Sequence, residues 1–179
     1  MNGKVKKIVL GGGCFWCLDP IFKNLNGVYH VEVGYAGGTV NSPSYEQVCS
    51  GRTGHAEVIE IGYEPEAISL KSLLEVFFHV HDPTTLNRQG ADVGTQYRSI
   101  ILVNDGEEKD LVQKMVEEID QSELWGNKIV TEVAVLEKFY PAEDPHQNYF
   151  EKNPWAGYCQ VVINPKLKKF KEKFADLLK

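Results

Sequence analysis

Several features that assign a chain to a specialised class of protein are missing from these 179 residues. No apolar run approaches the ~20 residues that a membrane-spanning helix needs. The N-terminus offers only Ile8, Val9 and Leu10 before a run of glycines, which is too short for the apolar core of a secretory signal. The net charge of −6 gives no general attraction to nucleic acid or to anionic membranes. We therefore expect a cytoplasmic protein that binds neither nucleic acid nor membrane.

Cysteine is sparse as well. The four cysteines are scattered, which argues against a disulfide framework and fits a reducing compartment. In such a compartment a closely spaced pair is more often catalytic or metal-binding. The sequence also lacks internal repeats, low-complexity stretches and an evident linker, and its length suits one hydrophobic core. We expect a single domain over residues 1–179 and a monomeric protein.

The order of the expected elements indicates the fold class. Strands are expected at residues 5–10, 29–35, 57–63, 98–103, 131–136 and 160–163. Helices are expected at 69–79 with Ser69 as N-cap, after Asn104–Asp105, and after Asn164–Pro165, where lysines form a solvated face. A long polar loop is expected at 81–96. This mixture, without regular βαβ alternation, predicts an α+β fold. We expect a mixed or antiparallel sheet packed with helices in a two-layer, ferredoxin-like-related sandwich.

The most informative segment is Gly11-Gly12-Gly13-Cys14-Phe15-Trp16-Cys17, directly after the first expected strand. Glycines let a substrate approach the backbone closely, the aromatic pair supplies an apolar wall, and a thiol stands at its edge. Two interpretations remain open: a dithiol exchange motif of the thioredoxin kind, or a nucleophile with a helper thiol. Pro20 follows closely, so it lies near the first turn of a distorted helix or, with Asp19, caps a later helix.

Other ligand-binding motifs are incomplete. The glycines do not form a dinucleotide-binding G-x-G-x-x-G, and no phosphate-loop motif is present. The pair Cys14-x-x-Cys17 lacks the following histidine of haem attachment and a second cysteine pair for zinc. His55, His81 and His146 form no i, i+4 pair with another ligand, so we expect them to make structural hydrogen bonds. We predict no metal site.

Several longer sequence blocks resemble the signature of the A-type peptide methionine sulfoxide reductases. They follow one another in the expected order along nearly the whole chain, at residues 13–16, 34–38, 45–57, 81–99 and 146–149. The resemblance implies an enzyme that reduces the S epimer of methionine sulfoxide, free or in proteins. It also implies recycling by a thioredoxin-like reductant, without a bound metal or organic cofactor.

The resemblance implies roles for individual residues. Cys14 is the implied nucleophile that attacks the sulfoxide sulfur and becomes a sulfenic acid. Glu57 is the implied acid that protonates the oxygen, a role that requires a pKa raised by burial. Tyr45 and Tyr97 are the implied phenols that hydrogen-bond this oxygen, and Asp92 is an implied polar residue lining the site.

The aromatic residues of the motif complete the implied site. Phe15 and Trp16 would hold the methyl group of the substrate, because aromatic faces offer water no hydrogen bond there. Taken without the resemblance, Phe15 and Trp16 could be core aromatics. Tyr45 and Tyr97 could likewise be ordinary half-buried tyrosines. Strand alternation alone would place Glu57 in solvent, and the resemblance reverses that interpretation.

The thiol that resolves the sulfenic acid is left open. Many members of the family use a cysteine in a flexible, glycine-rich C-terminal tail, and the approach to Cys159 resembles that tail, but a strand-like run and a lysine-rich helix follow it. Cys17 stands where glycine is commoner in the family, and its spacing from Cys14 permits a disulfide. We rank Cys17 first, Cys159 second and direct reduction by an external thiol third. Cys49 is expected to be a small buried hydrophobe.

Overall fold

The computed structural model describes residues 4–179, and its main feature is one mixed sheet. The six strands of this sheet lie in the order β7-β6-β1-β3-β2-β8. All neighbours are antiparallel except β6 and β7, which are parallel. The strands are β1 (Lys6–Gly11), β2 (Val28–Ala36), β3 (Ala56–Tyr63), β6 (Ile100–Val103), β7 (Glu132–Val135) and β8 (Tyr140–Pro141). A separate hairpin pairs β4 (Arg88–Gln89) with β5 (Asp92–Val93).

The six α-helices of the described residues are α1 (Phe15–Lys23), α2 (Tyr45–Cys49), α3 (Leu70–Val80), α4 (Gly106–Gln121), α5 (Tyr149–Lys152) and α6 (Asn164–Lys173). Of these, α1, α3 and α4 cover one face of this sheet. The run β1-α1-β2-β3-α3-β6 gives the strand order β6-β1-β3-β2, which is the ferredoxin-like arrangement. The predicted α+β class and mixed sheet are therefore confirmed. Within residues 4–179, none of the helices has the length and apolarity needed to cross a bilayer.

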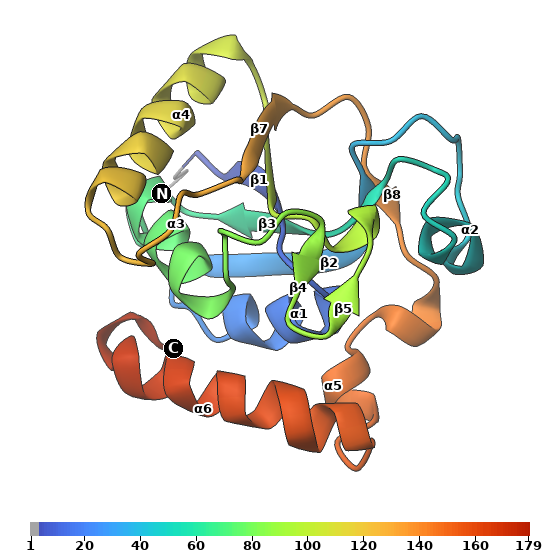
Figure 1. Ribbon diagram of the computed structural model, residues 1–179. Helices are drawn as coiled ribbons and strands as arrows, with labels where there is room; N and C mark the ends of the chain where they lie inside the picture. The colour runs from blue at the N-terminus through green and yellow to red at the C-terminus, as the bar shows by residue number, and fades with distance from the viewer. Residues whose placement is uncertain (1–3) are drawn as a thin grey trace.

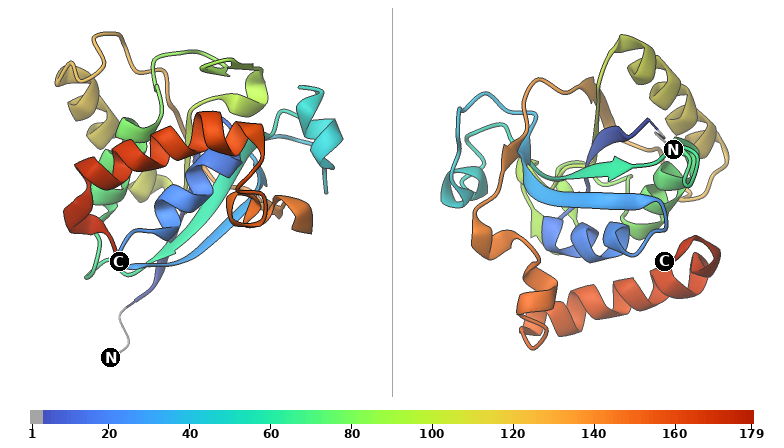
Figure 2. Two further views of the ribbon diagram at one scale, coloured as in Figure 1. Left: turned by 90° about the horizontal axis from the view of Figure 1, so that it is seen from below. Right: turned by 180° about the vertical axis from the view of Figure 1, so that it is seen from behind.

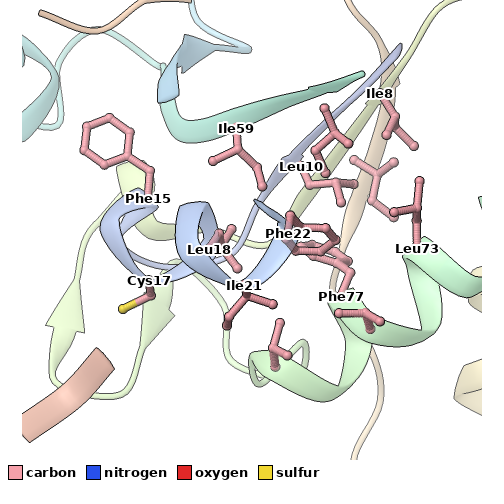
Figure 3. Close-up of a cluster of buried hydrophobic side chains, with 14 of the residues drawn as sticks. Ile8, Leu10, Phe15, Cys17, Leu18, Ile21, Phe22, Ile59, Leu73 and Phe77 are labelled. Atoms are coloured by element: carbon pink, nitrogen blue, oxygen red, sulfur yellow. The ribbon is translucent and has the colours of Figure 1, made fainter. Parts of the chain in front are cut away.

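Strand alternation divides the apolar side chains between the two faces of the sheet. Ile8, Leu10 and Ile59 point into the main core, where they meet side chains of α1 and α3 such as Phe22 and Phe77 (Figure 3). On the opposite face a smaller cluster is covered by the chain that follows β7. This smaller cluster contains Val9, Ala36, Ala56, Val58, Ile100 and Leu102, with Leu136 and Phe139 packed against it. Both faces of the sheet are thus shielded around its centre.

The C-terminal segment forms a further layer outside α1. A π-helical stretch, Cys159–Ile163, leads directly into α6, and α6 contacts both α1 and α3. Figures 1 and 2 show α6 running beneath α1, on the side away from the sheet. The expected strand at 160–163 is wrong. Cys159, Ile163 and Leu167 are buried at helical spacing, so packing against α1 overrides the strand preference of the β-branched residues.

Several predicted helix boundaries are confirmed. Ser69 caps α3, its hydroxyl accepting from the Ser72 amide at 3.1 Å, and Asp105 caps α4 in the same way. Pro20 lies inside α1, so the helix starts directly after Cys14 and the alternative of a later helix is wrong. The expected loop at 81–96 contains the β4–β5 hairpin and leads into a 3₁₀ turn, Thr95–Tyr97. Further 3₁₀ turns lie at Asp144–His146 and Ala175–Leu177.

Candidate active site

The glycine bend fixes the position of Cys14. A Cβ at Gly12 would lie 2.8 Å from the His81 ring, and a Cβ at Gly13 would lie 2.7 Å from Cγ of Gln89. Gly13 also has a φ of 86°, in the left-handed region that favours glycine, and its amide donates to the Tyr97 carbonyl at 3.2 Å. The bend therefore packs against its neighbours without space for side chains. It delivers Cys14 as the N-cap of α1, at the positive end of the helix dipole.

Glu57 lies on the face of β3 that points toward α1 and the main core. It shares this face with Ile59 and Ile61, and its exposed fraction is 1%. The prediction from alternation alone, that Glu57 faces solvent, is wrong. Glu60, and not Glu57, lies on the face opposite Ile59 and Ile61. Oε1 of Glu57 accepts from the Phe15 amide at 3.3 Å, whereas Oε2 has no hydrogen-bond partner among residues 4–179. One carboxyl oxygen thus remains available to a ligand.

Burial sets the protonation of this carboxyl group. It raises the pKa of Glu57 from 4.5 to about 8, and the charge of Asp92 adds to this effect. The Phe15 amide and the Cys14 thiol act in the opposite direction but are weaker than burial. At neutral pH Glu57 therefore carries a proton, which it can donate to a bound oxygen atom.

The thiol of Cys14 is also neutral at rest. Burial raises the pKa of Cys14 well above its ordinary value, and the charges of Glu57 and Cys17 raise it further, while the Trp16 amide lowers it. A neutral thiol thus lies beside a neutral acid in the free protein. A negative Glu57 disfavours the Cys14 thiolate. The thiol therefore ionises most readily by passing its proton to Glu57 once a ligand has taken the proton of the acid.

Two tyrosines lie near this pair. Burial raises the pKa of Tyr45, as do its contact with Cys49 and the charges of Glu57 and Cys14. Burial and then Glu57 and Cys14 raise the pKa of Tyr97. Both phenols therefore stay protonated at neutral pH and can donate hydrogen bonds. The structure brings these two predicted residues to the same site as Cys14 and Glu57.

An aromatic cluster forms one side of the site. Trp16 is partly exposed and stacks on Tyr149 with ring centroids 3.7 Å apart, and its Nε1 donates to Nδ1 of His146 at 3.3 Å. Phe15 is fully buried and packs near Tyr45, with centroids 6.5 Å apart. The accessible apolar surface therefore comes from Trp16 and Tyr45. Contact between Phe15 and a substrate requires the cluster to open.

We expect Trp16→Ala to weaken substrate binding more than thiol reactivity. Losing the apolar contact for one methyl group should raise the KM for a methionine sulfoxide peptide, the substrate that the resemblance implies, by roughly tenfold. Steady-state kinetics measure this change, and alkylation of Cys14 followed by mass spectrometry checks the thiol. Trp155→Ala is the matched control, because Trp155 is 84% exposed and should leave KM unchanged. An unaltered KM in Trp16→Ala would contradict a binding role for this ring.

The second cysteine of the motif, Cys17, faces a cavity that Cys14 also lines. Figure 3 shows that Phe15 and Cys17 leave the first turn of α1 on opposite sides. The hydroxyl of Tyr158 lies 3.4 Å from Sγ of Cys17 and donates to Oδ2 of Asp92 at 3.2 Å. A cavity of about 130 Å³ joins these groups; its lining residues are Cys14, Cys17, Gln89, Gly90, Ala91, Asp92, Tyr158, Val162 and Lys166. Both thiols of the motif therefore open onto one space.

The remaining cysteines lie elsewhere. Cys159 is completely buried in the π-helical stretch and does not line the cavity that Cys14 and Cys17 share. Cys49 is exposed at the end of α2, so its expected burial is wrong. The reason is that α2 projects from the body of the protein and buries only Val48 (Figure 1).

The three singled-out histidines make structural hydrogen bonds. His55 accepts from the Gly38 amide at 3.0 Å, and the buried His81 contacts the Phe77 carbonyl and the Ser99 hydroxyl. His146 accepts from Trp16, as described above. Burial lowers the pKa of His81 to about 4, so it remains neutral. Each ring thus contributes to packing and polar satisfaction, as predicted.

One cluster in the described chain could hold a metal ion, and the sequence did not suggest it. His30, Glu32 and Glu60 bring ligand atoms within 4.8 Å of one another. They lie on the face of the sheet opposite Glu57, and Nζ of Lys7 is 2.9 Å from Oε1 of Glu60. This lysine already supplies a positive charge to the cluster, and the cluster is separated from the thiols by the sheet.

Sequence reasoning missed Tyr158 and Lys166 as components of the site. Residues 158, 162 and 166 follow a helical spacing, and all three line the cavity beside Cys17. The prediction of a strand at residues 160–163 separates these residues along an extended chain, whereas helical turns stack them close together. Reading the segment as a helix would have placed Tyr158 and Lys166 together.

The fold and the site define a class of protein. A thiol caps a helix beside a buried, protonated carboxylic acid, and a second thiol lies on the same turn. This combination characterises a thiol-dependent oxidoreductase.

The comparisons with known proteins identify the family. The sequence model of the family described as "Peptide methionine sulfoxide reductase" matches residues 6–178. A methionine sulfoxide reductase of Nautilia profundicola is 57% identical over 164 residues, covering 92% of this chain and 93% of that protein. Reduced Mxr1 from Saccharomyces cerevisiae superposes with a TM-score of 0.79 at 38% identity, covering 87% of this chain and 90% of Mxr1. Mxr1 in complex with Trx2 gives a TM-score of 0.57 at 28% identity, covering 83% and 87%. The chain belongs to the peptide methionine sulfoxide reductase family and is an oxidoreductase.

Proposed function

We propose that this protein reduces methionine S-sulfoxide, free and in oxidised proteins, with Cys14 as nucleophile and Glu57 as proton donor. The observation that carries the proposal is the unpartnered, buried Oε2 of Glu57 beside the Cys14 thiol. A sulfoxide oxygen bound there accepts the Glu57 proton. The phenols of Tyr45 and Tyr97 supply further hydrogen bonds to the oxygen, and Trp16, supported by Phe15, contacts the methyl group.

The proposed first step joins the two sulfur atoms. The Cys14 sulfur forms a bond to the sulfoxide sulfur as Glu57 protonates the oxygen, and the Cys14 proton replaces the one that Glu57 gives up. The oxygen is then transferred to Cys14. Methionine leaves and Cys14 becomes a sulfenic acid. The sulfoxide is thereby reduced and the thiol is oxidised by the same two electrons.

We propose Cys17 as the thiol that resolves the sulfenic acid. The shared cavity supports Cys17, whereas Cys159 is buried in a helical segment and lacks the freedom of a tail. Attack of Cys17 on the sulfenic acid forms the Cys14–Cys17 disulfide and releases water. A thioredoxin-like reductant then reduces this disulfide, a partner supported by the likeness to Mxr1, whose complex with Trx2 is known. The reaction uses side chains of one copy only, so a monomer is sufficient for it, and the reductant that it requires is consistent with the proposed cytoplasmic location.

The turnover of separated sulfoxide epimers tests this function. We expect the S epimer, and not the R epimer, to be reduced with dithiothreitol and with thioredoxin. The C-x-x-C pair at a helix N-terminus supports a second candidate, general dithiol–disulfide exchange. Insulin-disulfide reduction without sulfoxide turnover would establish this second function and exclude the first.

A further inference from the structure

Tyr158 connects the second thiol to a carboxylate. Its hydroxyl donates to Oδ2 of Asp92 at 3.2 Å, so a lone pair of the same oxygen can accept from the Cys17 thiol at 3.4 Å. The hydrogen-bond chain therefore runs from Cys17 through Tyr158 to Asp92. Asp92 is on β5 and Tyr158 precedes the π-helical stretch, so the chain spans the gap between the hairpin and the C-terminal segment.

Lys166 adds a positive charge to the same cavity. It is half-buried in α6 and forms no ion pair with any of residues 4–179, although it lines the cavity beside Cys17. Burial raises the pKa of Cys17, while the Lys166 charge and the Tyr158 hydroxyl lower it. The negative groups that face Cys17 from β5 and β3 are Asp92 and Glu57, and both act against the thiolate. The C-terminal segment thus supplies the groups that favour ionisation of Cys17.

We propose that Tyr158 is a catalytic residue of the resolving step, passing the Cys17 proton to Asp92 while Lys166 stabilises the sulfur as it becomes negative. The proposal rests on the proposed function and on Cys17 as the resolving thiol. It gives the C-terminal segment a chemical role in addition to its packing role.

The step conserves atoms and electrons. Cys17 sulfur supplies the electron pair of the new S–S bond, and the S–O bond of the Cys14 sulfenic acid breaks with its pair on oxygen. The Cys17 proton moves to the Tyr158 oxygen as the Tyr158 proton moves to Asp92. Asp92 then returns a proton to the departing hydroxide, so that one water is released into the cavity that Asp92 and both thiols line. Tyr158 stays a neutral phenol throughout, and rotation of its hydroxyl restores the hydrogen bond to Asp92.

Single-turnover kinetics test the role of Tyr158. The reduced protein is mixed with excess methionine sulfoxide without a reductant, and methionine, sulfenic acid trapped by dimedone and the Cys14–Cys17 disulfide are each followed by mass spectrometry. We expect Tyr158→Phe to yield about one methionine per protein while disulfide formation slows by about 10²-fold and sulfenic acid accumulates. Tyr29→Phe is the control, because Tyr29 is 52% exposed on the sheet. Disulfide formation at the wild-type rate in Tyr158→Phe overturns the proposal, whereas absence of methionine in the wild type overturns the proposed function.

A second measurement covers the case in which Tyr158→Phe fails to fold. In a Cys14→Ser background, the pH dependence of Cys17 alkylation reports its ionisation. We expect Lys166→Met to move the midpoint to higher pH, and Lys169→Met, a neighbour on the exposed face of α6, to leave it unchanged. Equal midpoints in both variants would exclude the role of Lys166 and overturn the proposal.

Discussion

Glu57→Gln should slow methionine sulfoxide reduction by about 10²- to 10⁴-fold, the range for removing a general acid. Glutamine is nearly isosteric and its carbonyl oxygen can still accept from the Phe15 amide, so the first turn of α1 keeps its anchor. In the proposed mechanism, the loss is that of the proton which the carboxylic acid gives to the sulfoxide oxygen. Single-turnover formation of methionine measures the effect. Wild-type rates in this variant would remove Glu57 from the mechanism.

The same residue should impose a pH dependence. Because burial raises the pKa of Glu57 to about 8, the fraction of protonated acid falls as pH rises above that value. The wild-type rate should decline there, and the residual rate of Glu57→Gln should not show this decline. A pH profile of kcat/KM for the two proteins makes the comparison.

Stability provides an independent check on this protonation. Between pH 4.5 and about 8 the folded protein keeps the Glu57 proton that the unfolded chain has released, so the free energy of unfolding falls as pH rises through this window. Since each pKa unit corresponds to about 1.4 kcal/mol, the total effect is several kcal/mol. Glu57→Gln removes this contribution. Urea unfolding at two pH values should therefore show a smaller loss of stability in the variant than in the wild type.

Cys17→Ser should separate the two halves of the reaction. Cys14 still reduces one equivalent of sulfoxide, but its sulfenic acid has no neighbouring thiol in the shared cavity. Turnover with thioredoxin should fall by about 10²-fold or more, the loss expected when the thiol that forms the intermediate disulfide is missing. Turnover with dithiothreitol should be affected less, because a small thiol can enter and reduce Cys14 directly.

Cys159→Ser is the matched control for Cys17→Ser. Cys159 is completely buried in a helical stretch, so its replacement should leave turnover with thioredoxin close to that of the wild type. Peptide mapping of the oxidised wild-type protein identifies the bridge directly. A Cys14–Cys159 disulfide would show that the C-terminal segment unfolds during the cycle, and Cys17 would then lose its role.

The sequence predicts the sheet well because its signals are local. Strand alternation and helix caps such as Ser69 and Asp105 depend on neighbouring residues, and these elements form as expected. The prediction of a strand at residues 160–163 is wrong because the β-branched residues there favour a strand locally, whereas contact with α1 favours a helical state. Burial of Ile163 against the core decides its helical state, and this contact arises only once α1 and α6 meet.

The site is partly predictable for a similar reason. Composition and alternation do not reveal that Glu57 is buried; the resemblance to a known family supplied that interpretation, and the geometry of β3 explains it. The link from Cys17 to Tyr158 joins positions separated by 141 residues, a long-range contact that no local pattern encodes. The predicted burial of Cys49 rests on the usual burial of cysteine and is wrong, because α2 turns only Val48 inward and leaves Cys49 exposed.

The exposure of Cys49 has a practical consequence for every assay that counts sulfhydryls. It is the single accessible cysteine in the described chain, since the other three are buried. A bulky maleimide or an oxidant in the medium meets it first, and two molecules can become joined through it during storage. Preparations in which Cys49 is replaced by serine should therefore give clean titration stoichiometry for the reactive pair.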